Sequence, residues 1–186
     1  MGVNIRYVPL GADHYALALI GVDRPGIVAA VAGGLSDLGC NLEDVTTSLL
    51  RGHFAMVLEF SAPAAGDAGA IRRHLLARTA ALDVHLDVWP VAPSRPEGAA
   101  THVLRLHGPD RTGIVAAIAA VLAGLGASIR DMSCSRDDVD EPTYLVVVEV
   151  DVPGHVDDAV LERALRAVAD ELSLRLAVER ILPEPL

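Results

Sequence analysis

Residues 21–45 read GVDRPGIVAAVAGGLSDLGCNLEDV, and residues 108–132 repeat this stretch as GPDRTGIVAAIAAVLAGLGASIRDM. Thirteen of the 25 aligned positions are identical, without a gap. Each copy places Gly-x-Asp-Arg-x-Gly-Ile-Val after an apolar run and before a segment with helical apolar spacing. An internal repeat of this kind predicts two domains of about 90 residues each.

The pattern around each copy predicts the same order of elements, β-α-β-β-α-β. In the first copy, Asp23 is the expected helix cap, Pro25 fits the first helical turn, and Gly39 ends the helix. A three-residue insertion at 137–141 replaces the tight turn of the first copy. The expected strands are 14–20, 42–50, 54–60, 84–90, 102–107, 129–136, 143–150 and 174–181, and the other helices are 67–80, 112–125 and 156–171.

This order is that of the ferredoxin-like fold, so the expected class is α+β. Right-handed crossovers put both helices of a domain on one face of an antiparallel sheet with strand order 4-1-3-2. The second strand is then an exposed edge, which predicts edge-to-edge association between repeats or between chains. The expected domains are 1–91 (core 14–90) and 101–186 (core 102–181), joined by a linker at 92–100.

The first helix of each repeat has a second face of small residues. Alanine is a strong helix former, so this face requires no partner. The alternative is close packing against a neighbouring domain, which would explain the pair Gly33 and Gly34. The residues of this face are Ala29, Ala32 and Gly33 in the first copy and Ala116, Ala119, Ala120 and Ala123 in the second.

The charge and composition exclude several classes of function. All fifteen basic residues are arginine, so lysine Schiff bases and phosphate-loop lysines are absent. A net charge of −10 argues against direct binding of nucleic acid and fits a small zwitterion, a cation or a basic protein. With neither an apolar run of about 18 residues nor a secretory signal, the expected location is the cytoplasm and no membrane contact is expected.

The residues that usually perform catalysis or bind metals form no recognisable motif. Seven histidines and two cysteines lack the spacing of a zinc site, and the acidic run at 137–141 lacks the pattern of a calcium loop. No nucleophile elbow is present. Cys40 and Cys134 occupy non-equivalent positions, and buried or half-buried free thiols are expected. We therefore expect no catalytic residue, metal or cofactor.

The loop between the first strand and the first helix is suited to binding an anion. The first amides of a helix have no partner within it and lie at the positive end of its dipole, so they attract a carboxylate. Gly26 lets a ligand approach the backbone closely. Asp23 is a candidate partner for the ammonium group of an amino acid. Alternatively, Asp23 and Asp110 only cap their helices, although the two roles are compatible.

Both halves resemble ACT domains, which are small regulatory modules that sense amino acids. The resemblance covers residues 14–90 and 102–181. A pair with the loop motif in both copies is similar to the glycine cleavage system transcriptional repressor family. The matching residues are Gly21, Asp23, Arg24, Pro25, Gly26, Ile27, Val28, Leu35, Gly39, Asn41 and Asp44, and in the second copy Gly108, Asp110, Arg111, Gly113, Ile114, Val115, Leu122, Gly126 and Asp131.

The resemblance implies a ligand between the strand–helix loop of one domain and the start of the second strand of its neighbour. Thr112 and Ser128 stand where the first copy has Pro25 and Asn41, so the second copy binds differently or not at all. His107 either compensates with a ring nitrogen or is simply half-exposed. The implied ligand-binding residues are Gly21, Val22, Asp23, Arg24, Pro25, Gly26, Ile27 and Asn41, and His107, Gly108, Asp110, Arg111, Thr112, Gly113, Ile114 and Ser128.

The implied function is that of a non-enzymatic regulator that binds a small amino acid resembling glycine or serine. It would self-associate and act through a protein partner, either a transcription factor or an enzyme, and not on DNA directly. Glycine has five heavy atoms, so at about 1.5 kcal/mol per atom its affinity is micromolar at best. Two alternatives are a regulatory subunit that acts in trans on a metabolic enzyme and a ligand-free interaction module.

Overall fold

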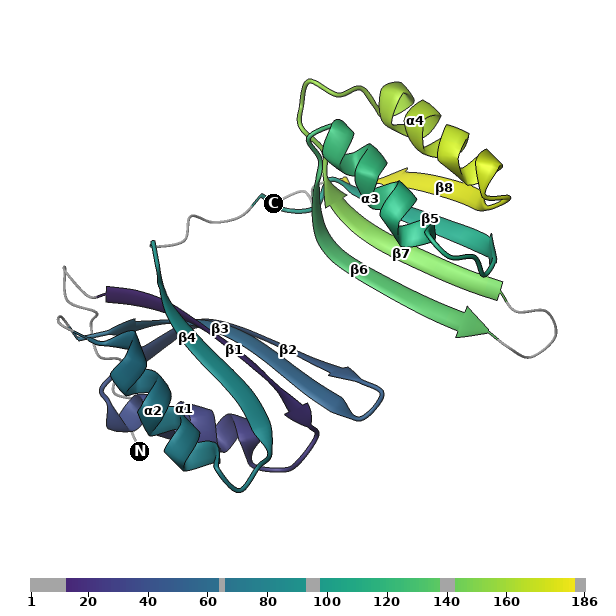
Figure 1. The fold of residues 1–186 in the computed structure, drawn as a ribbon. Helices are drawn as coiled ribbons and strands as arrows, with labels where there is room; N and C mark the ends of the chain where they lie inside the picture. The colour runs from purple at the N-terminus through teal and green to yellow at the C-terminus, as the bar shows by residue number, and fades with distance from the viewer. Residues whose placement is uncertain (1–12, 64–65, 93–97, 138–142, 183–186) are drawn as a thin grey trace. The chain divides into compact units, whose positions relative to one another are not determined.

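The computed structural model describes residues 13–63, 66–92, 98–137 and 143–182, which belong to two separate units, Met1–Arg95 and Pro96–Leu186 (Figure 1). The division falls within the predicted linker, of which residues 93–97 lie outside the described part of the chain. Most of the predicted acidic hairpin tip, at 138–141, also lies outside it. None of the described helices is long and apolar enough to span a membrane.

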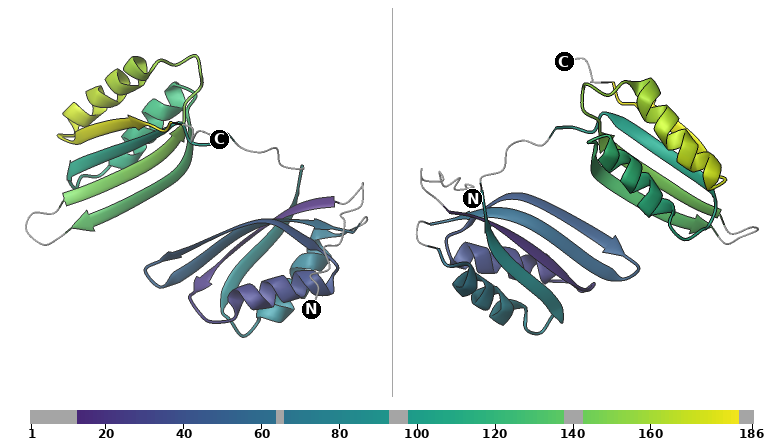
Figure 2. Two further views of the ribbon diagram at one scale, coloured as in Figure 1. Left: turned by 180° about the vertical axis from the view of Figure 1, so that it is seen from behind. Right: turned by 45° about the horizontal axis from the view of Figure 1, so that its top comes forward.

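Each unit is a four-stranded antiparallel sheet with two helices on one face, seen from two further directions in Figure 2. The strand orders β2-β3-β1-β4 and β6-β7-β5-β8 confirm the predicted order 4-1-3-2 and the ferredoxin-like fold. Predicted and observed ends differ by at most three residues. The elements are β1 Asp13–Val22, α1 Ile27–Asp37, β2 Asn41–Leu50, β3 His53–Ala62, α2 Ala68–Thr79, β4 Val84–Val91, β5 His102–Pro109, α3 Ile114–Gly124, β6 Ser128–Asp137, β7 Thr143–Asp151, α4 Asp158–Glu171 and β8 Arg175–Arg180.

The core of each unit lies between the helices and the sheet face that they cover. Alternate residues of the two central strands point into it, as the period of a strand requires. The helices add apolar residues at intervals of three and four. Central members of the two cores are Leu17, Leu58, Phe60, Leu35 and Leu75 in the first unit and Leu104, Val148, Ile118, Leu122 and Leu161 in the second.

Helices α1 and α2 approach each other closely at Gly33 and Gly34. A Cβ atom on Gly34 would lie 2.7 Å from Cδ2 of Leu75, and one on Gly33 would lie 2.8 Å from Nη2 of Arg78. Arg78 also pairs with Asp37 of α1 at 2.9 Å. Packing within the first unit therefore accounts for Gly34 without a neighbouring domain, whereas a Cβ atom on Gly33 would meet only the flexible end of Arg78.

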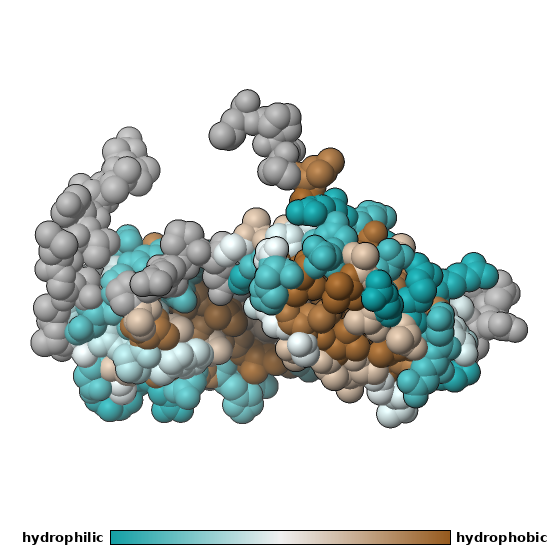
Figure 3. Space-filling model, turned by 90° about the horizontal axis from the view of Figure 1, so that it is seen from above, coloured by the Kyte–Doolittle hydropathy of each residue, from teal (hydrophilic) through white to brown (hydrophobic). Residues whose placement is uncertain are grey.

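Strand β2 is the predicted exposed edge of the first sheet, and all ten of its residues are exposed. Among them Leu49 and Leu50 leave 62% and 71% of their surface accessible. Figure 3 shows hydrophobic residues exposed among hydrophilic ones on the face turned to the viewer. Such an edge offers both unpaired backbone groups and apolar side chains to a partner strand. Association through this edge remains a prediction.

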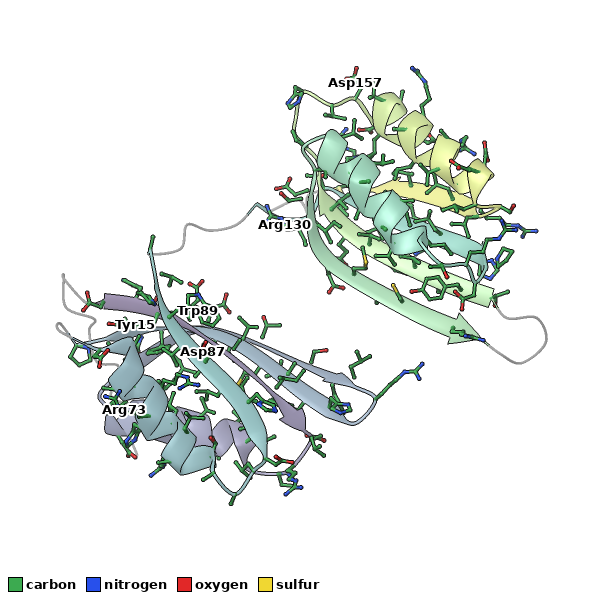
Figure 4. All side chains as sticks on the ribbon, viewed as in Figure 1. Tyr15, Arg73, Asp87, Trp89, Arg130 and Asp157 are labelled. Atoms are coloured by element: carbon green, nitrogen blue, oxygen red, sulfur yellow. The ribbon has the colours of Figure 1, made fainter. Side chains whose placement is uncertain are left out.

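The two units fix the loop before their second helix in different ways. In the first unit the hydroxyl of Tyr15, labelled in Figure 4, donates to the carbonyl oxygen of Gly66 at 2.7 Å. In the second, the buried His102 lies 3.3 Å (Nε2 to Oδ1) from Asp158 at the start of α4. Arg180 of β8 adds an ion pair to Asp158 at 3.2 Å. In the second unit a histidine and an arginine therefore fix the start of the second helix, whereas in the first unit a tyrosine fixes the loop before it.

We expect Asp158→Asn to destabilise the second unit at neutral pH. Desolvation raises the pKa of Asp158, but the hydrogen bonds and positive charges of His102 and Arg180 outweigh it and hold the pKa below its ordinary value of 3.8. Because the folded-state pKa is lowered, this stabilisation is present above pH 3.8 and is lost as the pH falls through the folded-state pKa. Urea unfolding followed by circular dichroism at neutral pH and below pH 3.8 measures it. Equal sensitivity of wild type and variant to acid would contradict the interpretation.

Candidate functional site

The loop before the first helix of each unit ends on a glycine in the left-handed conformation. This glycine is Gly26, with φ 100°, before α1 and Gly113, with φ 97°, before α3. The first bonds within the helices run from the amide of Ala30 to the carbonyl of Gly26 and from the amide of Ala117 to that of Gly113. Among the described residues, no cap side chain bonds to either helix start, and a Cβ atom on either glycine would meet nothing within 4 Å. The first amides of both helices therefore lack a capping side chain in this part of the chain, and such amides can bind a ligand or water.

The predicted capping role of Asp23 and Asp110 is wrong. The left-handed glycine starts each helix three residues after the aspartate, which leaves Pro25 before the helix and starts α3 at Ile114 instead of 112. The backbone amide of Asp23 instead donates to the carbonyl of Gly52 at 2.9 Å, which ties the loop to the β2–β3 turn. A carboxylate that does not cap its helix remains available to other partners.

The first glycine of each motif has a structural role. A Cβ atom on Gly21 would lie 2.8 Å from the carbonyl oxygen of Asp83 and 2.7 Å from Cγ1 of Val84. The same atom on Gly108 would lie 2.9 Å from the carbonyl oxygen of Ser173. In both units the end of the first strand, β1 or β5, passes the start of the last strand, β4 or β8, too closely for a side chain at this position. These glycines position the loop but offer no side chain to a ligand.

Asn41 and Ser128 lie at the opposite end of their sheets from the loops. Asn41 is paired with Ser61, which is paired with His14 near the start of β1, whereas Gly21 is near its end. Seven residues of strand separate these positions, on the order of 23 Å. The second unit repeats this arrangement, with Ser128 beside Asp151 and Gly108 beside Tyr144. Within one unit the predicted residues therefore do not form a single site, and their meeting across a domain boundary remains a prediction.

A cavity of about 480 Å³ adjoins the loop of the second unit. It lies between the loop, the first turns of α3 and the start of β7. Four predicted residues line it together with Tyr144, which the sequence interpretation missed. The full lining is Asp110, Arg111, Gly113, Ile114, Val115, Ala116, Ala119 and Tyr144.

The polar groups at this cavity come from the loop and from two strands. The Asp110 carboxylate pairs with Nη1 of Arg136 on β6 at 3.3 Å. A hydrogen bond and the electrostatic effect of the exposed Cys134, together with burial and the negative charge of Asp110, raise the pKa of Tyr144 above its ordinary value of 10. The phenol is therefore protonated at neutral pH. Asp110, Arg111 and Tyr144 thus give the cavity a carboxylate, a guanidinium and a neutral hydroxyl, and Arg136 adjoins it through its pair with Asp110.

Several features lie away from this cavity. His107 is exposed on the sheet face opposite the helices, since its neighbour Leu106 belongs to the core. In the first unit a cavity of about 550 Å³ lies against β1, β3, β4 and α2, where Arg72 pairs with Asp87 at 3.0 Å, and no predicted binding residue lines it. Asp87 and Trp89, both on β4, are labelled in Figure 4. Among the described residues, no three His, Cys, Asp or Glu side chains are grouped to hold a metal ion.

Comparison with known proteins gives two matches to family models. Residues 16–88 and residues 102–171 each match an ACT domain. The chain is 26% identical to the glycine cleavage system transcriptional repressor of Escherichia coli over 88% of each chain. It is 35% identical over 41% of its own length to a UPF0237 protein of Methanocaldococcus jannaschii, covering 83% of that protein.

Two solved structures have the same fold over most of the chain. An unknown protein from Galdieria sulphuraria superposes with a TM-score of 0.77 and 24% identity, covering 92% of this chain and 99% of that one. A putative glycine cleavage system transcriptional repressor superposes with a TM-score of 0.75 and 17% identity over the same shares. At these identities the likeness establishes the fold alone.

We expect Gly21→Ala to lower the free energy of unfolding of the first unit by about 2 kcal/mol, because its Cβ would collide with backbone atoms that cannot move aside. The single tryptophan of the chain, Trp89, lies on β4 and reports this unit in urea unfolding followed by fluorescence. Gly33→Ala is the control, since its Cβ meets the mobile end of Arg78 and alanine favours a helix. Equal unfolding midpoints for the two variants would refute the structural role of Gly21.

Proposed function

Because the chain belongs to the ACT-domain family and contains two ACT domains in tandem, we propose that it is a regulatory protein that binds a small amino acid and acts on a protein partner. The observation that carries this proposal is the uncapped helix start beside the cavity of the second unit. An α-amino acid has a carboxylate for the free amides and an ammonium group for Asp110. The described residues of the second unit provide both complements.

The ligand that we propose is glycine, serine or a similarly small amino acid. The similarity to the glycine cleavage system transcriptional repressor over 88% of both chains supports a role in the control of amino-acid metabolism. A ligand of this size binds no more tightly than about micromolar, because its few atoms limit the binding free energy. Weak, reversible binding suits a protein that follows the concentration of a metabolite.

The proposed mode of regulation is contact with another protein in the cytoplasm. A net charge of −10 disfavours binding to a polyanion such as DNA. The exposed edge β2 supports self-association through a second copy of the chain. A second copy could also supply the start of β2, with Asn41, to a loop that lies far from Asn41 in its own unit. Ligand binding would then be coupled to assembly, which is how a small molecule can change the surface offered to a partner.

Isothermal titration calorimetry against the twenty amino acids at millimolar concentration tests this function. We expect saturable heat with glycine, serine or a close analogue, and a dissociation constant between about micromolar and millimolar. Asp110→Asn should weaken this binding at least several-fold, since a neutral amide attracts the ammonium group less than a carboxylate does. Absence of heat with every amino acid would refute the proposed function.

A further inference from the structure

The cavity of the second unit differs in polarity from the equivalent position of the first. On β6 and β7, Arg136 is paired with Tyr144, and on β2 and β3 Leu49 is paired with Phe54. These pairs are equivalent in the alignment of the two repeats. The second unit therefore has a phenol and a guanidinium where the first has a phenyl ring and an isobutyl group.

The Tyr144 hydroxyl has hydrogen-bonding capacity left for a ligand. A protonated phenol donates one hydrogen bond and also accepts. Its pKa is raised by the hydrogen bond to Cys134, by burial and by nearby negative charge, so the hydroxyl keeps its proton. Because Tyr144 lines the cavity, the role of its hydroxyl that Cys134 does not occupy is open to a ligand there. A ligand hydroxyl can both donate and accept, so it fits either remaining role.

The Asp110–Arg136 pair is complementary to a zwitterion. Its two charged groups are 3.3 Å apart, and both side chains are partly accessible to solvent. An α-amino acid that binds in the cavity beside this pair offers its ammonium group to Asp110, while its carboxylate, held by the amides at the start of α3, is also attracted by the nearby charge of Arg136. Leu49 cannot form such a pair with the equivalent Asp23 of the first unit. The second unit alone thus combines both charges with a hydroxyl at this position.

We infer that the cavity of the second ACT domain is selective for small amino acids with a hydroxyl side chain, with Tyr144 as the residue that determines specificity and Arg136 as the residue that orients the ligand. This inference rests on the proposed function and adds which repeat binds and which ligand it prefers. Of the two expectations for the second copy, it favours different binding over no binding. An alanine ligand fills the same space but leaves the free capacity of Tyr144 unsatisfied, so serine is favoured.

The experiment replaces residues of the second unit by their equivalents from the first, in the full-length chain. The reverse exchange in the first unit is the control. Serine and alanine are titrated calorimetrically into the wild type, Tyr144→Phe, Arg136→Leu and the matched control Phe54→Tyr. We expect the wild type to prefer serine over alanine about tenfold. Tyr144→Phe should bring that ratio close to one with little change for alanine, whereas Arg136→Leu should weaken both ligands about tenfold or more. Phe54→Tyr should change neither value.

The outcomes separate this inference from the proposed function. Binding of amino acids with an unchanged serine-to-alanine ratio in Tyr144→Phe would overturn the inference and leave the proposed function standing. A change of that ratio in Phe54→Tyr instead would assign selectivity to the first repeat and would also overturn it. If no amino acid binds to the wild type, both fail. Circular dichroism melting of each variant verifies that loss of binding is not loss of the fold.

Discussion

Two glycines in each Gly-x-Asp-Arg-x-Gly loop impose the constraint on which the arrangement of the sites rests. The first has no side chain because a Cβ atom there would lie within 3 Å of backbone atoms at the start of the last strand of its sheet. The second takes a left-handed conformation that only glycine adopts at low cost. Between them they hold the loop against the sheet and start the helix without a capping side chain. The uncapped amides that result are the basis of the binding function that we propose.

The sequence predicts the fold well because two independent signals agree. The repeat divides the chain, and the change between strand and helix periodicity orders the elements within each half. The helix starts were mispredicted because Asp23 satisfies the usual pattern of a cap. Asp67 satisfies the same pattern and does cap α2, through bonds to the amides of Gly69 and Ala70. Only the backbone angle at Gly26, which sequence alone does not reveal, distinguishes the two cases.

The candidate site was predicted in part. Asp110, Arg111, Gly113 and Ile114 are adjacent in sequence and lie together at one cavity, as expected of a single loop. Tyr144, which lines the cavity, and Arg136, which pairs with Asp110, were missed because strand pairing, not sequence proximity, brings them to this end of the sheet. A signal was present, since each is a polar replacement of an apolar residue in the aligned repeat. Asn41 and Ser128 were grouped with the loops by resemblance, and the sheet geometry separates them within each unit.

The central claim is that the open helix starts bind the carboxylate of a small amino acid. The most direct measurement is an ¹H–¹⁵N correlation spectrum of the protein during titration with serine. Our account predicts saturable shifts of the amides of Gly113, Ile114 and Val115 at the start of α3, with the largest changes confined to that loop and cavity. Saturable shifts elsewhere in the chain, with these amides unchanged, would contradict it.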